Sequence, residues 1–187
     1  MLNKDTRNKL SAMTISLHWI VALSIIVLLA MGIYMEENHA YALYPWHKSF
    51  GMLILLFVVA RILWRIYNNW PVPVSNYAKV EKITAKVVHY VLIIATLMMP
   101  VSGMLMSGLG GHGLEFFGIE LMAANPDPAN PGKVIAINGF IAGAGHELHE
   151  ILGNVIIAAL ALHIIGALKH HFIDKDGTLK RMFGKKV

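Results

Sequence analysis

The sequence predicts an all-α membrane protein: a bundle of four transmembrane helices in one domain over residues 1–187, with both termini in the cytoplasm. Three observations support this prediction. Hydrophobic residues make up 56% of the chain and charged residues only 14%, whereas soluble domains carry about 25% charged residues. The mean hydropathy is +0.57, which argues against a soluble globular protein. Four long apolar stretches divide the chain, and the basic residues gather in alternate connections between them.

The first expected span covers about residues 12–35, and His18 is its only imidazole or charged side chain. This length is enough to cross the hydrocarbon core, which takes about 20 apolar residues as a helix. The basic residues before it resemble those of a signal peptide. However, the apolar run is longer than a signal peptide requires, and no small-residue cleavage site follows it. We therefore expect this span to be retained as a helix.

The second expected span covers about residues 45–65 and is interrupted by Arg61. A long basic side chain near the end of a span can extend to the interface, so Arg61 does not exclude a transmembrane helix. Trp46 and Trp64 flank the apolar part, as is typical of side chains at the two membrane interfaces.

The third and fourth expected spans cover about residues 85–109 and 146–169. A further apolar piece at 134–145 is too short to span and is rich in glycine, so we expect an interfacial segment there and no fifth helix. The remainder of the 110–145 connection holds a turn-rich run from Asn125 to Gly132. We expect this connection to lie outside the lipid, because irregular backbone cannot be satisfied in hydrocarbon.

Lysine and arginine determine the expected orientation. Fourteen of the 16 lie in the N-terminal segment, in or beside the second-to-third connection, and in the C-terminal tail. The other side of a four-span arrangement holds only Lys48 and Lys133, together with seven acidic residues. The positive-inside rule therefore places both termini in the cytoplasm of a bacterial inner membrane. The basic pI of about 9.5 reflects this topology, and no nucleic-acid partner is expected.

The ten histidines include four that form a pattern. His149 and His163 are fourteen residues apart, so they share one stripe of a helix and lie about 21 Å apart along its axis. His18 matches the depth of His163 near the cytoplasmic end, and His47 matches the depth of His149 near the external end. Two facing pairs at two depths are what two bis-histidine haems require, with one imidazole on each side of each porphyrin.

Small side chains accompany these four histidines. Each has a glycine or alanine four residues later, and two further glycines fall at the external level: Ala22, Gly51, Gly153, Ala167, Gly32 and Gly103. Small residues would let a flat macrocycle approach the helices. The alternative is that glycine and alanine are simply common in membrane helices.

Three other roles for these histidines fit the pattern less well. A membrane histidine can form an interhelical hydrogen bond, but that role does not predict matched depths. Zinc ions would each need three or four ligands, and carboxylates are missing from the span interiors. The run His146-Glu147-Leu148-His149-Glu150 lacks the four-residue histidine spacing of a metalloprotease helix. The absence of cysteine excludes disulfides, cysteine-ligated iron–sulfur clusters and covalently attached haem.

Several motifs point together to one known family. They are Ser16-Leu17-His18-Trp19, Trp46-His47-Lys48-Ser49-Phe50-Gly51, the His89 segment with Pro100 and Gly103, Leu148-His149-Glu150, His163 with Leu168-Lys169-His170-His171-Phe172, and the tail Asp174–Met182. Over essentially the full length the chain resembles the prokaryotic cytochrome b561 family, which is related to the cytochrome b subunits of nickel–iron hydrogenase and formate dehydrogenase. The resemblance implies two non-covalent b haems with His18, His47, His149 and His163 as axial ligands, and electron exchange with the quinone pool. One branch of that family oxidises superoxide and reduces ubiquinone.

Three further residues fall at or near the cytoplasmic level. Arg61 is fourteen residues after His47, and its functional interpretation is neutralisation of haem propionates; the alternative is an interface anchor. His89 and His170 are candidates for quinone hydrogen bonding or proton delivery. For His170 and its neighbour His171, contacts with lipid headgroups are the alternative.

The leading functional hypothesis is transmembrane electron transfer through two b haems, between the quinone pool and a periplasmic donor or acceptor. Superoxide:ubiquinone oxidoreductase is one specific version, although the acidic external face is unfavourable for an anionic substrate. A second hypothesis is a membrane-anchor subunit that relays electrons for a periplasmic redox protein. A transporter without haem is a third. Filled axial positions favour electron transfer over oxygen activation.

Overall fold

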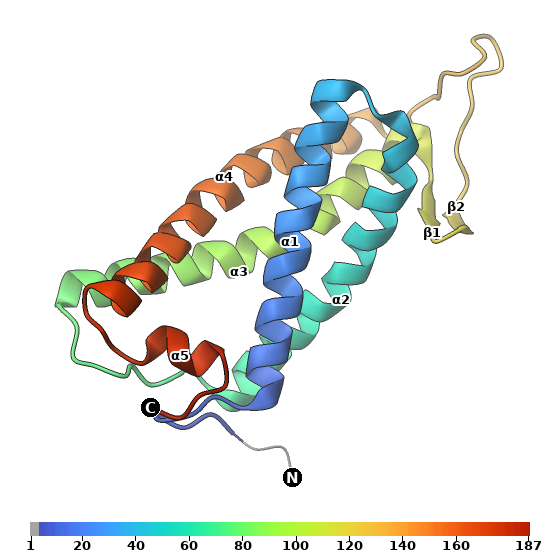
Figure 1. Ribbon diagram of the computed structural model, residues 1–187. Helices are drawn as coiled ribbons and strands as arrows, with labels where there is room; N and C mark the ends of the chain where they lie inside the picture. Colours follow the sequence, from blue (N-terminus) through green and yellow to red (C-terminus); the bar gives the residue numbers. More distant parts are fainter. Residues whose placement is uncertain (1–3) are drawn as a thin grey trace.

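Four long helices form the body of the molecule in a computed structural model, which describes residues 4–187. They are α1 (Ala12–Asn38), α2 (Tyr44–Asn68), α3 (Lys79–Ser107) and α4 (Gly139–Phe172). Each is long and apolar enough to cross a membrane. Figure 1 shows the four as one bundle with both ends of the chain at the same end of it. The expected all-α membrane bundle is confirmed, whereas the side on which the termini lie stays a prediction.

The shorter elements lie at the two ends of the bundle. They are η1 (Tyr41–Leu43), the π-helical turn η2 (Gly108–His112), the antiparallel strands β1 (Leu114–Phe116) and β2 (Ile119–Met122), and the short helix α5 (Thr178–Met182). The 110–145 connection therefore contains a hairpin and is not wholly irregular. The sequence did not predict these strands, because polar and apolar residues alternate there over only a few positions.

The fourth helix begins seven residues earlier than the expected 146. Asn138 caps it, since its side-chain oxygen accepts a hydrogen bond from the Ile141 backbone N–H at 3.1 Å. Gly145 then lets α4 approach α3 closely, because a Cβ there would lie 2.9 Å from the Met106 backbone nitrogen. The second half of the expected interfacial segment at 134–145 forms the first turns of α4, and no fifth long helix is present among the described residues. Hydropathy marks the embedded part of a helix, not its cap.

A buried apolar layer occupies the middle of the bundle. Ile25, Ile54 and Ile156 are 6%, 3% and 0% exposed, and they belong to one buried cluster with Val21 and Val58. Each isoleucine lies seven residues, about two helical turns, after one of the histidines singled out by the sequence. The apolar layer therefore separates the two histidine levels.

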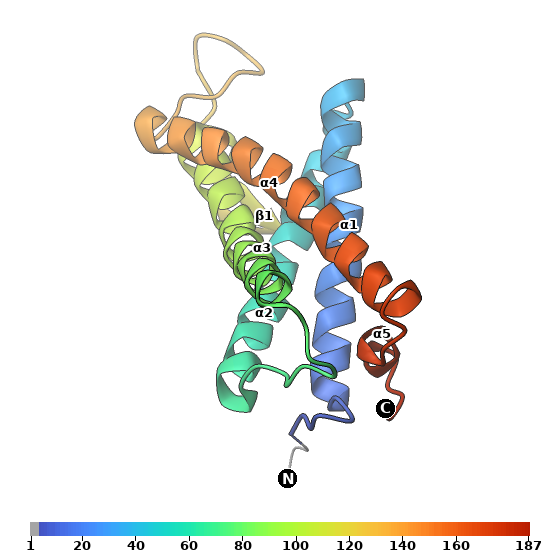
Figure 2. The same cartoon turned by 90° about the vertical axis from the view of Figure 1, so that its left-hand side faces the viewer.

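The termini close the end of the bundle at which they lie. The Asp5 carboxylate accepts hydrogen bonds from the Ser11 backbone N–H at 2.8 Å and the Thr14 hydroxyl at 2.9 Å. It also pairs with Arg65 at 3.3 Å, which links the start of α1 to the end of α2. In Figure 2, α5 lies beside the lower part of α1, where the Trp19 indole N–H donates to the Met182 carbonyl at 2.9 Å.

Candidate functional site

Two candidate histidines face each other at the end of the bundle away from the termini. The ring centres of His47, on α2, and His149, on α4, are 6.3 Å apart. The two rings line an apolar cavity together with Gly51, Met99 and aliphatic side chains of α1, α2 and α4. The structure thus brings together the pair that the sequence assigned to the external level.

The hydrogen bonds of His149 determine which of its nitrogens is free. Its Nδ1 lies 3.0 Å from the Met99 carbonyl oxygen and 3.1 Å from the Ser102 hydroxyl, and Ser102 is fully buried. A carbonyl oxygen only accepts, so the proton of a neutral ring belongs on Nδ1, and Nε2 keeps its lone pair. Metal-binding histidines characteristically donate their second N–H to such a group. Ser102 was not singled out by the sequence analysis, because nothing in the chain pattern marks an orienting hydroxyl.

Glycines lie directly against both rings of this pair. A Cβ on Gly103 would lie 3.1 Å from Cε1 of His149, and a Cβ on Gly32 would lie 3.6 Å from Cε1 of His47. Gly51 has no atom within 4 Å of where its Cβ would lie, although it lines the cavity. The Nδ1 atom of His47 is buried without a hydrogen-bond partner among the described residues. The small side chains therefore make the space that a flat ligand between the two imidazoles needs.

Three histidines meet at the other level, closer to the termini. The ring centres of His18, on α1, and His163, on α4, are 6.1 Å apart. His89, on α3, stands edge-on to His163 at 5.1 Å. Its Nδ1 contacts the Ala85 carbonyl oxygen, so a neutral His89 carries its proton on Nδ1 and presents Nε2 as an acceptor. The helix begins at Lys79, so His89 lies ten residues inside α3 and does not start it.

Arg61 lies beside this group, as its fourteen-residue spacing from His47 predicts. Its Nη2 is 3.4 Å from Nδ1 of His18. Within residues 4–187, Arg61 makes no salt bridge with a carboxylate. Because a guanidinium only donates, this contact places the proton of a neutral His18 on Nε2. Metal binding by His18 through Nε2 therefore requires Arg61 to turn to another acceptor.

The spacing of both pairs fits a bis-imidazole metal centre. Metal–imidazole bonds of about 2 Å put the centres of two axial rings about 6 Å apart, one on each side of the metal. The observed 6.3 and 6.1 Å agree with that distance. The free Nε2 of His149 and the glycines against the rings are also what a haem requires.

His170 lies apart from the histidine group, in a polar cluster at the end of α4. Its Nδ1 is 2.8 Å from an Asp174 carboxylate oxygen and 3.5 Å from one of Asp176. Its ring packs against Tyr77 with centres 4.5 Å apart. The hydrogen bond from Lys169 is the main reason that the pKa of Asp174 lies below its usual value. The sequence placed His170 correctly along α4, but not these tail contacts.

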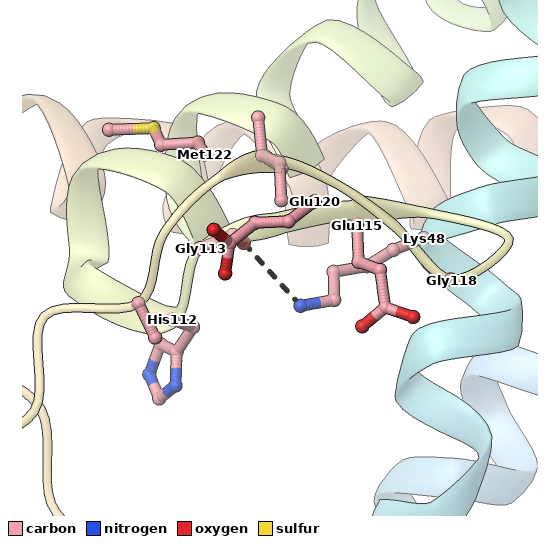
Figure 3. A pocket seen from close by; sticks show the side chains of 9 residues that line it. Lys48, His112, Gly113, Glu115, Gly118, Glu120 and Met122 are labelled. Atoms are coloured by element: carbon pink, nitrogen blue, oxygen red, sulfur yellow. Dashed lines mark hydrogen bonds between the residues drawn. The ribbon is translucent and has the colours of Figure 1, made fainter.

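A second cavity, of about 320 Å³, lies between the start of α2 and the β1–β2 hairpin and was not expected from the sequence. Lys48, the residue after His47, contributes to its wall, and Figure 3 shows its ammonium group with the carboxylates of Glu115 and Glu120 around the same space. The Lys48 Nζ donates to the Ser107 hydroxyl at 3.2 Å and to the Gly113 carbonyl at 3.5 Å. The cavity is therefore lined both by the hairpin and by α2, the helix that carries His47.

Comparison with known proteins agrees with this geometry. Residues 9–185 match the family model described as prokaryotic cytochrome b561. The chain is 30% identical over 188 residues to cytochrome b561 homolog 2 of Escherichia coli (strain K12), which covers 97% of this chain and 94% of that protein. It is 28% identical to the probable superoxide oxidase CybB of Yersinia pestis, over 95% of this chain and 97% of that protein. The chain therefore belongs to the prokaryotic cytochrome b561 family, whose members are multi-pass proteins of the bacterial inner membrane that bind b-type haem and transfer electrons.

Proposed function

We propose that the protein carries electrons across the membrane through two b haems, one held by His47 and His149 and the other by His18 and His163. The observation that carries this proposal is that four histidines from three helices form two pairs with ring centres 6.3 and 6.1 Å apart. A structural hydrogen-bonding role would explain one such pair but gives no reason for two at the same spacing.

The residues around each pair define the chemistry. A haem held by one of these imidazole pairs would supply one-electron transfer and not oxygen activation. The Met99 carbonyl and Ser102 hydroxyl hold the ring of His149 in the tautomer that leaves Nε2 free. Ile25, Ile54 and Ile156 exclude water from the layer between the two levels. The levels are about 21 Å apart, so the pair spans much of the hydrocarbon core.

Ubiquinone is the proposed partner at the level nearer the termini. The Nε2 atom of His89 is available to accept a hydrogen bond from a quinol hydroxyl. His170, with Asp174 and Asp176, is the proposed group for proton exchange with the cytoplasm, because it is the imidazole paired with carboxylates at that end.

Superoxide is the proposed electron donor at the opposite end. The name of the Yersinia pestis relative supports it, as does the cavity beside His47 that Lys48 helps to line. In balanced form, two superoxide anions each give up one electron and leave as oxygen, while one quinone takes both electrons and two protons. Glu115 and Glu120 offset the charge of Lys48 there, which favours the alternative that a periplasmic redox protein docks and this chain relays as its membrane anchor.

Histidine replacement tests the haem assignment. His47→Ala and His149→Ala should each remove the same component of the dithionite-reduced minus oxidised spectrum. His18→Ala and His163→Ala should each remove the other. Haem content per chain should fall from two to one in every variant. His146→Ala, on the same helix as His149 but outside the pairs, serves as the control and should keep both components.

The pairing fails if His47→Ala and His149→Ala lose different spectral components. A purified chain with no haem at all would instead support the transporter hypothesis. Quinone reduction by the isolated chain with superoxide would support the oxidase, whereas co-purification of a periplasmic redox protein together with inactivity of the isolated chain would support the anchor subunit.

A further inference from the structure

The β1–β2 hairpin presents an uncovered apolar side. On β2, Ile119 and Leu121 are 63% and 60% exposed, and Phe117 in the turn is 41% exposed. Residues 113–124 contain no lysine or arginine. Exposed aliphatic side chains at this density are unusual on a surface that faces water.

The opposite side of the hairpin is polar and already has a role. Glu115 and Glu120 are direct cross-strand partners, and both line the cavity that also contains Lys48. Glu120 lies between Ile119 and Leu121 in the sequence, so β2 alternates between the cavity and the uncovered side. The hairpin is therefore amphipathic, with its charged side facing inward to the cavity and its apolar side facing away from the bundle.

The turn of the hairpin points back toward the middle of the membrane. In Figure 1 the strands descend beside α2, while the loop that follows β2 extends the other way. The Phe117 backbone N–H donates to the Ser49 hydroxyl at 3.0 Å, and that hydroxyl lies 3.3 Å from the Glu115 carbonyl oxygen. Ser49 lies five residues after the start of α2, or about 7.5 Å along its axis. The turn is thus deeper than the first turn of a membrane-spanning helix.

The apolar side is continuous with the surface that α2 presents to lipid. Trp46 and Phe50 are 54% and 42% exposed on α2, and the ring of Phe117 packs against both, with centres 6.2 and 5.2 Å away. Aromatic side chains of this kind gather where hydrocarbon meets the headgroups. The hairpin adds its own apolar residues to that band.

We infer that the hairpin inserts its apolar side, Phe117, Ile119 and Leu121, into the lipid leaflet at the end of the bundle opposite the termini. Lipid acyl chains are the occupant, because the surface continues that of a transmembrane helix. The depth is that of the headgroup–acyl boundary, since the free edge of β2 keeps polar backbone groups that the hydrocarbon core cannot satisfy. On this inference part of the 110–145 connection lies at the lipid boundary, whereas the sequence predicts that all of it lies outside the lipid.

The absence of cysteine from the chain makes a direct test simple. Single-cysteine variants Ile119→Cys and Leu121→Cys of the full chain are spin-labelled and reconstituted in vesicles of phosphatidylethanolamine and phosphatidylglycerol. Accessibility to oxygen, which concentrates in lipid, is compared with accessibility to a water-soluble nickel chelate. Val27→Cys on the lipid-facing surface of α1 and Asn130→Cys in the external loop are the lipid and water references. Glu120→Cys is the matched neighbour on the cavity side.

Both test positions should show an oxygen-to-nickel ratio several-fold above that of Asn130→Cys and in the direction of Val27→Cys, while Glu120→Cys should show a lower ratio than either. Ratios equal to that of Asn130→Cys at both positions would overturn the inference. Protection from both reagents at low protein-to-lipid ratio, with cross-linking between Ile119→Cys chains, would also overturn it by showing that a second copy covers this side.

Discussion

Single polar side chains in this bundle are held by very few partners, so each partner has a large effect. His149 has its tautomer determined by the Met99 carbonyl and Ser102, and among residues 4–187 His18 has only the guanidinium of Arg61 beside its Nδ1. In an apolar surrounding an unpaired charge costs several kcal/mol at the centre of a span and less near its end. Arg61 therefore needs an acceptor, and a haem propionate is a compact one that a guanidinium can bind with two hydrogen bonds.

Replacing Arg61 by glutamine should keep both haems and lower the reduction potential of the haem nearer the termini. The ferrous form carries one positive charge fewer than the ferric form, so loss of a nearby cation favours the oxidised state. We expect a decrease on the order of 50 mV, where about 59 mV is a tenfold change for a one-electron couple. Redox titration of the purified variant measures it. A variant with full haem content and two unshifted potentials would make Arg61 an interface anchor.

Ser102→Ala should have a different effect. It removes one of the two groups at Nδ1 of His149 but leaves the Met99 carbonyl, so the haem should stay bound. Loss of an orienting partner weakens metal binding by about 10–100-fold, so haem is expected to dissociate faster from the pair at His47 and His149. Transfer of haem to apomyoglobin measures the rate. An unchanged rate would show that the carbonyl alone orients the ring. Thr96→Ala, whose hydroxyl bonds only within α3, is the control.

Helices contribute to the site through the small residues at their contacts and through the connections that fix their ends. Gly103 and Gly145 let α3 and α4 come close enough for His149 to contact the backbone of α3. Gly51, in contrast, lines the cavity of the His47–His149 pair, and no described atom lies within 4 Å of where its Cβ would be. At the other end, Asp5 joins the start of α1 to the end of α2.

A substitution at Gly51 distinguishes a haem site from a glycine that serves only helix packing. Gly51→Leu should fold normally, because no atom lies within 4 Å of where its Cβ would be, yet it should lose the haem of the His47–His149 pair. The leucine fills the cavity between the rings. Gly143→Leu, which also has open space around its Cβ position but lies on the exposed side of α4, is the control and should keep both haems. Haem content and elution as a single species are the measurements. Full haem content in Gly51→Leu would place the macrocycle elsewhere.

Asp5 makes the stability of the fold depend on pH. Burial alone would raise the pKa of its carboxyl, but hydrogen bonds from Ser11, Thr14 and Asn68 outweigh that effect and hold the pKa below its usual 3.8. The stabilisation is therefore present above about pH 4 and is lost as the pH falls through the lower folded-state pKa. Asp5→Asn should lower the free energy of unfolding at pH 7 by about 2–3 kcal/mol, a charged hydrogen bond's share.

Thermal unfolding in detergent at pH 7 and at pH 3 tests this dependence. The difference between wild type and Asp5→Asn should shrink at the lower pH, since the carboxyl of the unfolded wild-type chain, with its usual pKa of 3.8, is then mostly protonated and folding must release that proton. Glu37→Gln, an exposed change at the far end of α1, should match wild type at both values. An equal difference at both pH values would mean that the side chain acts through its shape and not its charge.

The whole molecule has both of its ends at one end of the bundle (Figure 1), as an even number of spans requires. The distribution of lysine and arginine predicts that this end lies in the cytoplasm. The two histidine levels then lie one toward each side of the membrane, with Ile156 fully buried midway between them on α4. This arrangement lets one chain connect redox partners on opposite sides.

Reporter fusions test that orientation. Alkaline phosphatase fused after Val187 should be inactive and a green fluorescent protein there should fluoresce, because phosphatase folds only outside the cytoplasm. Phosphatase inserted at Asn130, in the connection between α3 and α4, should be active. Active phosphatase at the C-terminus would reverse the orientation and place the quinone site on the other side.

The sequence alone was sufficient for the four helices, their order and the two depths of His18, His47, His149 and His163. These features follow from local hydropathy and from the fixed rise and turn of an α-helix, which do not depend on distant contacts. The positions of Arg61 and His89 near the His18–His163 pair also follow from the fixed rise and turn of the helix.

Only the tertiary structure decided the features that depend on contacts between distant segments. The hairpin, the cavity beside Lys48, the orienting role of Ser102 and the tail contacts of His170 all join residues far apart in the chain. Helix α4 also begins at Gly139 because of a cap and a close crossing with α3, neither of which is part of a hydropathy pattern. A helix repeats regularly, so its sequence specifies it locally, whereas caps, turns and crossings are specified by which segments meet.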